Sequence, residues 1–120
     1  RAYAVRPPAQ WEFIAYDASL DHVKHQRWLR HFLDGRPVVF ETSDVIAQQM
    51  AARNGVGVAV LPTMLGERDA ELVRLDVAPE PPEAMLWLVT YPDLRRAPSI
   101  KAVMAFLVDC IAREPHLKSP

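Results

Sequence analysis

Residues 37–62, PVVFETSDVIAQQMAARNGVGVAVLP, have the pattern that predicts a strand, a helix and a second strand in close succession. The apolar run 38–40 stops at the polar triplet 42–44, and an apolar-periodic stretch then continues to Asn-Gly at 54–55. A second apolar run, 56–61, ends at a proline. This length is close to the minimum for a right-handed crossover between parallel strands. Such a crossover places a loop and a helix N-terminus at one sheet edge, where open α/β sheets bind small molecules.

The sequence on either side extends this pattern in both directions. The predicted elements are an aromatic-rich strand at 11–16, a helix at about 22–34 closed by Gly35, an edge strand at 71–77, a buried-type strand at 85–91 and a last helix beginning at Pro98. A proline-dense connector, 78–84, precedes the final strand and helix. The element order predicts a doubly wound α/β fold with a mostly parallel sheet, in which the last strand and helix return to another lobe.

The composition fits a folded domain and excludes several classes of protein. Half of the 120 residues are apolar, which predicts a packed core rather than disorder. The 14 basic and 15 acidic residues give a net charge of −1, and no basic helix marks a nucleic-acid surface. One cysteine excludes an internal disulfide and fits a reducing compartment. No apolar run reaches membrane-spanning length, so no membrane partner is predicted.

Five sequence blocks occur in an order that has a parallel in a known family. They are W-x-F-I-x-Y-D-x-x-L at 11–20, a block at 42–62 that joins T-S-D to G-V-G and L-P, L-V-R-L at 72–75, L-W-L-V-x-Y-P-D-L-R-R at 86–96, and P-S-I-K-A-V-M-A-F-L at 98–107. In this order the chain resembles the effector-binding region of LysR-type transcriptional regulators. Each block alone is common in α/β folds, whereas five in order are much more specific.

The resemblance implies a periplasmic-binding-protein-like (type 2) fold of two lobes, with a small co-inducer between them. Residues 1–10 would be a linker or a strand remnant, 11–84 the second lobe, and 85–120 a return strand and C-terminal helix toward the first lobe. The first lobe and a winged helix-turn-helix would then be absent, and the chain would be an excised fragment. The parent is expected to be cytoplasmic, to form dimers or tetramers, and to reach operator DNA only through that N-terminal domain.

Thr42 and Ser43 are the leading candidates for contact with the effector. They lie where a predicted strand gives way to a helix, so their hydroxyls and the free N–H groups of the first turn could hold a carboxylate or phosphate. Simple N-capping is the alternative, and the two roles are compatible. Asp44 counts against binding of an anionic effector here, because its own carboxylate favours the same positive helix end.

Tyr16 and Pro62 are predicted to lie at the same edge of the sheet. Tyr16 ends the first strand and could line the cleft, or it could cover the sheet as a half-buried aromatic. Pro62 follows the third strand and could supply a wall and a carbonyl group, or act only as a strand terminator. The four ligand-binding candidates therefore depend on three parallel strands whose carboxyl ends meet at one crevice.

The remaining reactive side chains have ordinary explanations. His22 and His25 have the i,i+3 spacing of a metal-ligand pair, but His31 falls on another helix face, so solvated histidines are favoured. Cys110 lies in the apolar stripe of the last helix and is expected to be a buried small hydrophobe. The sequence contains no catalytic motif or phosphate-binding loop, so no enzyme activity, cofactor or metal site is predicted.

The sequence therefore favours the effector-sensing domain of a LysR-type regulator, which binds a small co-inducer in an interlobe cleft to modulate transcription. A lobe of an exported solute-binding protein is the alternative, because it has the same architecture. A small α/β enzyme is a third reading, weakened by the lack of a clustered acid, base and nucleophile. The apolar stripe from Ile100 to Ile111 also predicts self-association of the isolated chain.

Overall fold

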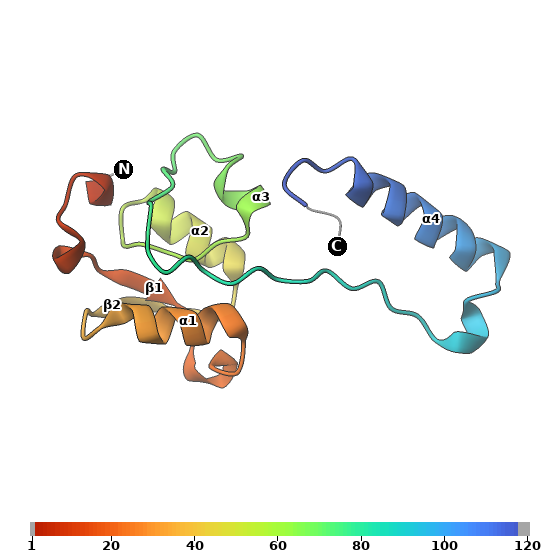
Figure 1. The fold of residues 1–120 in the computed structure, drawn as a ribbon, viewed down its shortest axis with the longest axis horizontal. Coiled ribbons are helices and arrows are strands. Elements are labelled where there is room, and N and C mark those ends of the chain that lie inside the picture. The colour runs from red at the N-terminus through yellow and green to blue at the C-terminus, as the bar shows by residue number, and fades with distance from the viewer. Residues whose placement is uncertain (1, 118–120) are drawn as a thin grey trace. The chain divides into compact units, whose positions relative to one another are not determined.

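The structure is a computed structural model that describes residues 2–117. The chain divides into two compact units, Arg1–Ala84 and Met85–Pro120 (Figure 1). The elements, with η for a 3-10 helix, are η1 (Ala2–Ala4), η2 (Pro8–Gln10), β1 (Phe13–Ala15), η3 (Ala18–Leu20), α1 (Lys24–Leu33), β2 (Val38–Glu41), α2 (Val45–Arg53), α3 (Thr63–Gly66), η4 (Pro92–Leu94) and α4 (Pro98–Ala112). α1 matches the helix predicted at about 22–34 to within two residues at each end, and α4 begins at the predicted Pro98.

The first unit is built on a short parallel sheet. β1 pairs with β2 in parallel, and Ala15 lies opposite Glu41 at the carboxyl end of the pair. On the other side of β1, Val58 makes a single parallel bridge, with hydrogen bonds of 2.8 Å to Ile14 and Glu12. β1 is therefore the central strand, and all three of its residues are buried. The parallel arrangement predicted around residues 37–62 is confirmed for these strands.

α1 and α2 both pack on β1, from opposite sides of the strands in Figure 1. Leu29 and Leu33 of α1 lie in the buried core, which is completed by Tyr3, Trp11, Phe13 and Ala15. α1 ends where Asp34 and Gly35 take positive φ angles of 46° and 79°, the left-handed geometry predicted for the glycine. Arg36 then folds back over the rings of Phe13 and Phe32, at 4.8 and 4.7 Å from the ring centroids, which closes this end of the core.

Residues 2–10, expected as a linker or strand remnant, form two 3-10 turns instead. Tyr3 is only 7% exposed, and its hydroxyl lies 3.2 Å from Val56 O and 3.3 Å from Glu12 Oε2. The reason is the hydrophobic effect: the ring joins the apolar core while its hydroxyl still finds polar partners. The N-terminal turns are thus part of the first unit.

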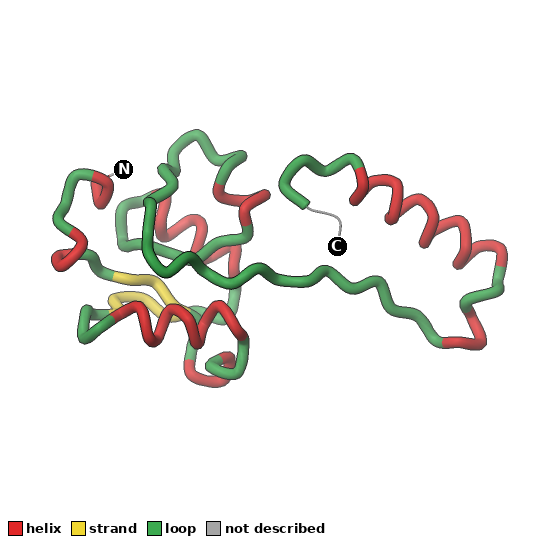
Figure 2. Tube along the Cα trace, in the orientation of Figure 1, coloured by secondary structure: helices red, strands yellow, loops and turns green. Residues whose placement is uncertain are grey.

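Three predicted strands are shortened or missing. The third strand reduces to the Val58 bridge, because the backbone N–H of Tyr16, just past β1, donates to the Gln26 side chain and not to this segment. The stretches 71–77 and 85–91 form no strand pairing within the described part of the chain, and Figure 2 shows continuous loop from the end of α3 to η4. An alternating or apolar pattern predicts a strand only where a neighbouring strand can complete its ladder.

The packed face of α2 does not contain its largest apolar side chains. Ile46 and Met50 are 48% and 42% exposed. The buried residue is Gln48, with Val45 and Ala52 partly covered on either side at helical spacing. The unbranched Gln48 and the small Ala52 on this face allow close approach of the helix to the sheet.

The second unit consists of an extended segment, η4 and α4. Pro98 occupies the first position of α4, as predicted. Large apolar side chains on both the segment and the helix are exposed, including Trp87 at 76% and Phe106 at 66%. Cys110, expected to be buried, is exposed as well, because it lies on the same uncovered helix.

Candidate functional site

The predicted site lies at the carboxyl edge of the parallel strands. Tyr16 directly follows β1, Thr42 and Ser43 directly follow β2, and Pro62 follows the segment that Val58 joins to β1. Because the three segments run in parallel, their carboxyl ends emerge on the same side of the sheet. The topology therefore brings all four positions to one edge.

The N-terminus of α2 is capped by Asp44 and not by the two hydroxyl residues. Asp44 Oδ1 accepts a 2.9 Å hydrogen bond from Ile46 N, and Asp44 N in turn donates to Thr42 Oγ1 at 3.2 Å. The carboxylate thus occupies the positive end of the helix. The Thr42 hydroxyl accepts from the backbone and still has its own O–H group to donate.

Ser43 and Tyr16 present two further hydroxyls at this edge. Ser43 is exposed, and its side chain has no hydrogen-bond partner within residues 2–117. Tyr16 is half-buried against His25, with ring centroids 5.4 Å apart. Burial raises the pKa of the Tyr16 phenol, and the nearby Asp44 carboxylate raises it further. Tyr16 is therefore a neutral donor at physiological pH, and it lies within electrostatic reach of the α2 cap.

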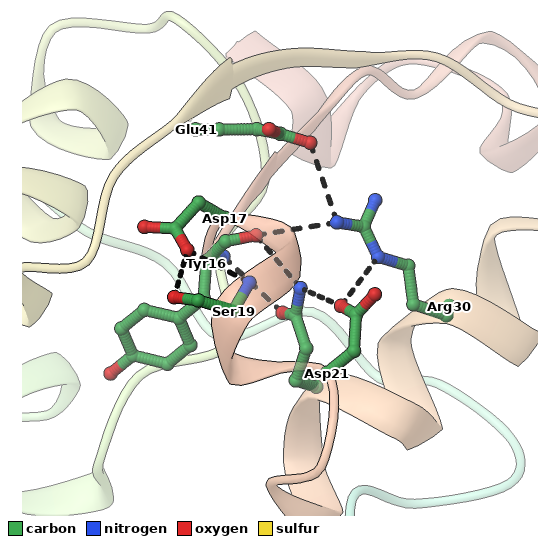
Figure 3. Close-up of polar contacts among 7 residues, drawn as sticks. Tyr16, Asp17, Ser19, Asp21, Arg30 and Glu41 are labelled. Carbon is green, nitrogen blue, oxygen red and sulfur yellow. Dashed lines mark hydrogen bonds and ion pairs between the residues drawn. The ribbon is translucent and has the colours of Figure 1, made fainter.

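A polar network behind Tyr16 ties β1, α1 and β2 together (Figure 3). Arg30 Nε donates to Asp21 Oδ1 at 3.2 Å, and its Nη2 lies 3.3 Å from both Glu41 Oε1 and Tyr16 O. Gln26, which lies on α1 like Arg30, forms hydrogen bonds with the Tyr16 backbone and with the Asp21 carboxylate. The hydrogen bond from Gln26 and the Arg30 charge lower the pKa of Asp21, so that carboxyl stays ionised at neutral pH.

The pattern of predicted strands and helices does not indicate this network, although the sequence holds one signal for it. Gln26, Leu29 and Leu33 are spaced so that they lie on one face of the helix, and all three are buried. A polar residue inside an apolar stripe predicts a buried group with designated partners. Arg30 and Asp21 carry no such signal, because charged residues beside a stripe are usually solvated.

Pro62 and His25 have defined structural roles. Pro62 precedes α3, and its carbonyl oxygen accepts from Leu65 N at 2.9 Å and Gly66 N at 3.0 Å, so that oxygen is already used by the helix. Its ring remains exposed. Burial lowers the pKa of His25, which keeps the imidazole neutral beside Tyr16 at pH 7. Within residues 2–117 no group of three His, Cys, Asp or Glu side chains has the arrangement of a metal site.

A hollow of about 420 Å³ lies elsewhere in the first unit, between α2 and the chain around α3. Its buried carboxylate, Asp69, accepts from Gln49 Nε2 at 2.9 Å and lies 3.5 Å from Arg53 Nε. The hydrogen bond from Gln49 is the main cause of the lowered pKa of Asp69. These polar groups satisfy one another, so they brace the loop after α3 rather than face a ligand.

The comparisons with known proteins identify the family. The family model of the LysR substrate binding domain matches residues 5–111, nearly the whole chain. Neither the curated proteins nor the solved structures gave a match. None of the helices within residues 2–117 is long and apolar enough to cross a bilayer. The domain implies a periplasmic-binding-protein-like fold, with which the helices and small parallel sheet agree. The chain therefore belongs to the LysR substrate-binding domain family, the effector-binding region of LysR-type regulators.

Proposed function

We propose that the chain senses a small-molecule effector for a LysR-type DNA-binding transcriptional regulator and has no catalytic activity. The single observation that carries this proposal is the family match over residues 5–111. The parallel strands support it, because they bring Tyr16, Thr42, Ser43 and Pro62 to the sheet edge where α/β folds bind small molecules. The match favours a regulator over an exported solute-binding protein.

The proposed mechanism is a shift between two arrangements of two lobes. In this proposal residues 11–84 form the second lobe of a doubly wound, type 2 domain, and residues 85–120 return to the first. An effector held between the lobes binds the closed arrangement more tightly than the open one. That difference in affinity changes the geometry of a dimer or tetramer on operator DNA, which the parent contacts through its N-terminal domain in the cytoplasm.

The chemistry of this edge points to recognition by neutral hydrogen bonds. Thr42, Ser43 and Tyr16 each supply a hydroxyl, and hydroxyls suit the oxygen atoms of a polar effector. An anion at the α2 N-terminus would meet the Asp44 carboxylate, which already caps that helix. We therefore propose that this lobe contacts an uncharged polar part of the effector, and not the anionic group that the hydroxyl pair alone suggested.

Thermal-shift screening of the chain and its Thr42→Val/Ser43→Ala double mutant tests the proposal. The library should contain small carboxylic acids and matched neutral alcohols and amides. A compound at 100 times its Kd stabilises a protein by about 2.7 kcal/mol. Loss of two hydrogen bonds of about 1 kcal/mol each should weaken binding roughly 30-fold and reduce that shift.

A matched double mutant, Thr90→Val/Ser99→Ala, carries the same two changes in the second unit and should respond as the wild type does. Equal responses in all three proteins would remove the two hydroxyls from the site. Stabilisation of the wild type by carboxylic acids only would contradict the neutral contact and restore an anionic one.

A further inference from the structure

Gln26 is a buried amide on the apolar face of α1. It is 1% exposed and has Leu29 and Leu33 as neighbours on the same face of the helix. A primary amide carries two donors and an acceptor, and burying it without partners is unfavourable. Its partners therefore show which contact the residue maintains.

Both ends of the amide pair with the backbone of Tyr16. Gln26 Oε1 accepts from Tyr16 N at 3.2 Å, and Gln26 Nε2 donates to Tyr16 O at 2.8 Å. The second Nε2 hydrogen reaches Asp21 Oδ1 at 3.0 Å. The side chain thus supplies a donor and an acceptor in the way that a neighbouring strand would.

The amide takes the place where the third strand would continue. On this side of β1, Ile14 N donates to Val58 O at 2.8 Å. The alternation of a parallel ladder would next pair Tyr16 N with residue 60. Tyr16 N donates to Gln26 instead, so the sheet stops there and the position of Tyr16 is set by α1.

Arg30 reinforces the same anchor. Its guanidinium lies 3.3 Å from Tyr16 O and joins Asp21 and Glu41 to that point (Figure 3). The end of β1 is therefore held to α1 and, through Glu41, to the end of β2. Charge-assisted hydrogen bonds of this kind hold a geometry more firmly than neutral ones.

We propose that Gln26 is a positioning residue of the effector site: by replacing a strand at the backbone of Tyr16, it fixes the phenol beside the Thr42–Asp44 turn. This inference rests on the proposed function of that edge. Gln26 itself does not touch the effector, since it is buried behind Tyr16.

The test follows Tyr16 directly in the full chain without ligand, by ¹⁹F NMR of protein labelled with 3-fluorotyrosine. The chain has three tyrosines, and Tyr16→Phe assigns the signal. In Gln26→Met, which keeps a side chain of similar length, the Tyr16 signal should move toward that of Tyr91, which is 77% exposed. The pKa of the Tyr16 phenol should also fall toward its ordinary value as the ring becomes exposed and leaves Asp44.

Two further variants separate positioning from stability. Leu33→Ala opens a cavity in the core from the same helix, so it should lower the urea midpoint and leave the Tyr16 signal in place. Gln26→Glu should displace the signal at neutral pH, because its carboxylate cannot donate to Tyr16 O and faces the Asp21 carboxylate. On acidification the neutral carboxyl regains a donor, and the signal should return toward wild type, which Gln26→Met should not do.

An unchanged Tyr16 signal in Gln26→Met would overturn the positioning role, as would an equal displacement in Leu33→Ala. The measurement needs no effector, so it is independent of the thermal-shift screen. A displaced signal in Gln26→Met, together with effector responses that survive Thr42→Val/Ser43→Ala, would support the positioning of Tyr16 and reject the proposed hydroxyl site.

Discussion

Gly57 is where the third parallel segment comes closest to β1, and replacing it with alanine tests that packing. Gly57 is buried, and a Cβ atom there would lie 3.0 Å from Glu12 O and 3.3 Å from Ile14 Cγ1. The nearer atom is a backbone carbonyl oxygen, which cannot rotate away as a side chain does. Gly57 does not have a left-handed φ, so the effect of alanine is one of space and not of backbone strain.

The magnitude follows from the contacts that must give way. Glu12 O accepts from Val58 N at 2.8 Å, so moving the segment outward also stretches this hydrogen bond. Overpacking of a buried position destabilises by about 1–3 kcal/mol. Restricting the unfolded chain with alanine offsets about 0.4–1 kcal/mol of this. We expect Gly57→Ala to lower the free energy of unfolding by roughly 1–2 kcal/mol.

Urea unfolding compares this variant with Gly66→Ala as a matched control. Nothing lies within 4 Å of a Cβ atom at Gly66, which is in α3, so alanine there should be neutral or stabilising by up to about 1 kcal/mol. With a slope of about 1–3 kcal/mol per molar urea, the Gly57→Ala midpoint should fall by roughly 0.3–2 M. Midpoints that match for the two variants would refute close packing of residues 56–60 on β1. Pro62 would then lose its place at the site.

Tyr3, His25 and the second unit each give a further prediction. Tyr3→Phe removes the hydroxyl bonded to Val56 O and should lower the free energy of unfolding, measured in urea, by about 1 kcal/mol. Because burial raises the pKa of Tyr3, the wild type should lose stability above about pH 10, and the variant should lose less; an unaltered pH profile would contradict this. Because burial lowers the pKa of His25, NMR titration should give a value below about 6.5. The neutral imidazole then favours the folded state, and this contribution is lost as pH falls through the lowered pKa; an ordinary pKa would argue against burial of His25. The exposed apolar side chains of α4 should make the chain self-associate, so sedimentation velocity should show concentration-dependent association that Phe106→Lys reduces. A monomer at all concentrations would contradict self-association through this surface.

The helices and the parallel crossover were predictable because their signals are local. A helix satisfies its own backbone, so periodic apolar residues with Gly35 or Pro98 at the ends are sufficient to locate it. The predicted strands at 71–77 and 85–91 failed for the converse reason. Their apolar side chains resemble those of strands, but a strand needs hydrogen-bond partners on another segment, and sequence pattern alone does not say whether one is within reach.

The candidate site was predictable in its location and not in its anchoring. Thr42, Ser43 and Tyr16 follow from where strands end, which the pattern indicates. The contact between Gln26 and Tyr16 joins two elements through a side chain that acts as a backbone group. No propensity rule describes that arrangement, and only the position of Gln26 within an apolar stripe marked it as unusual.

The charges at the sheet edge explain why such anchoring matters for the proposed site. Asp44 caps the positive end of α2, and burial, with a further contribution from the Asp44 carboxylate, raises the pKa of the Tyr16 phenol, so an effector there meets neutral hydroxyls and no free cation among these groups. Neutral hydrogen bonds are directional and weaken steeply when misaligned, whereas attraction between charges tolerates displacement. A site of this kind depends for its selectivity on where the hydroxyls are held. The backbone of Tyr16 is held by Gln26 and Arg30, and that of Thr42 by a 3.1 Å hydrogen bond from its N–H to Ala15 O, so the backbone that carries both hydroxyls is positioned before any effector arrives.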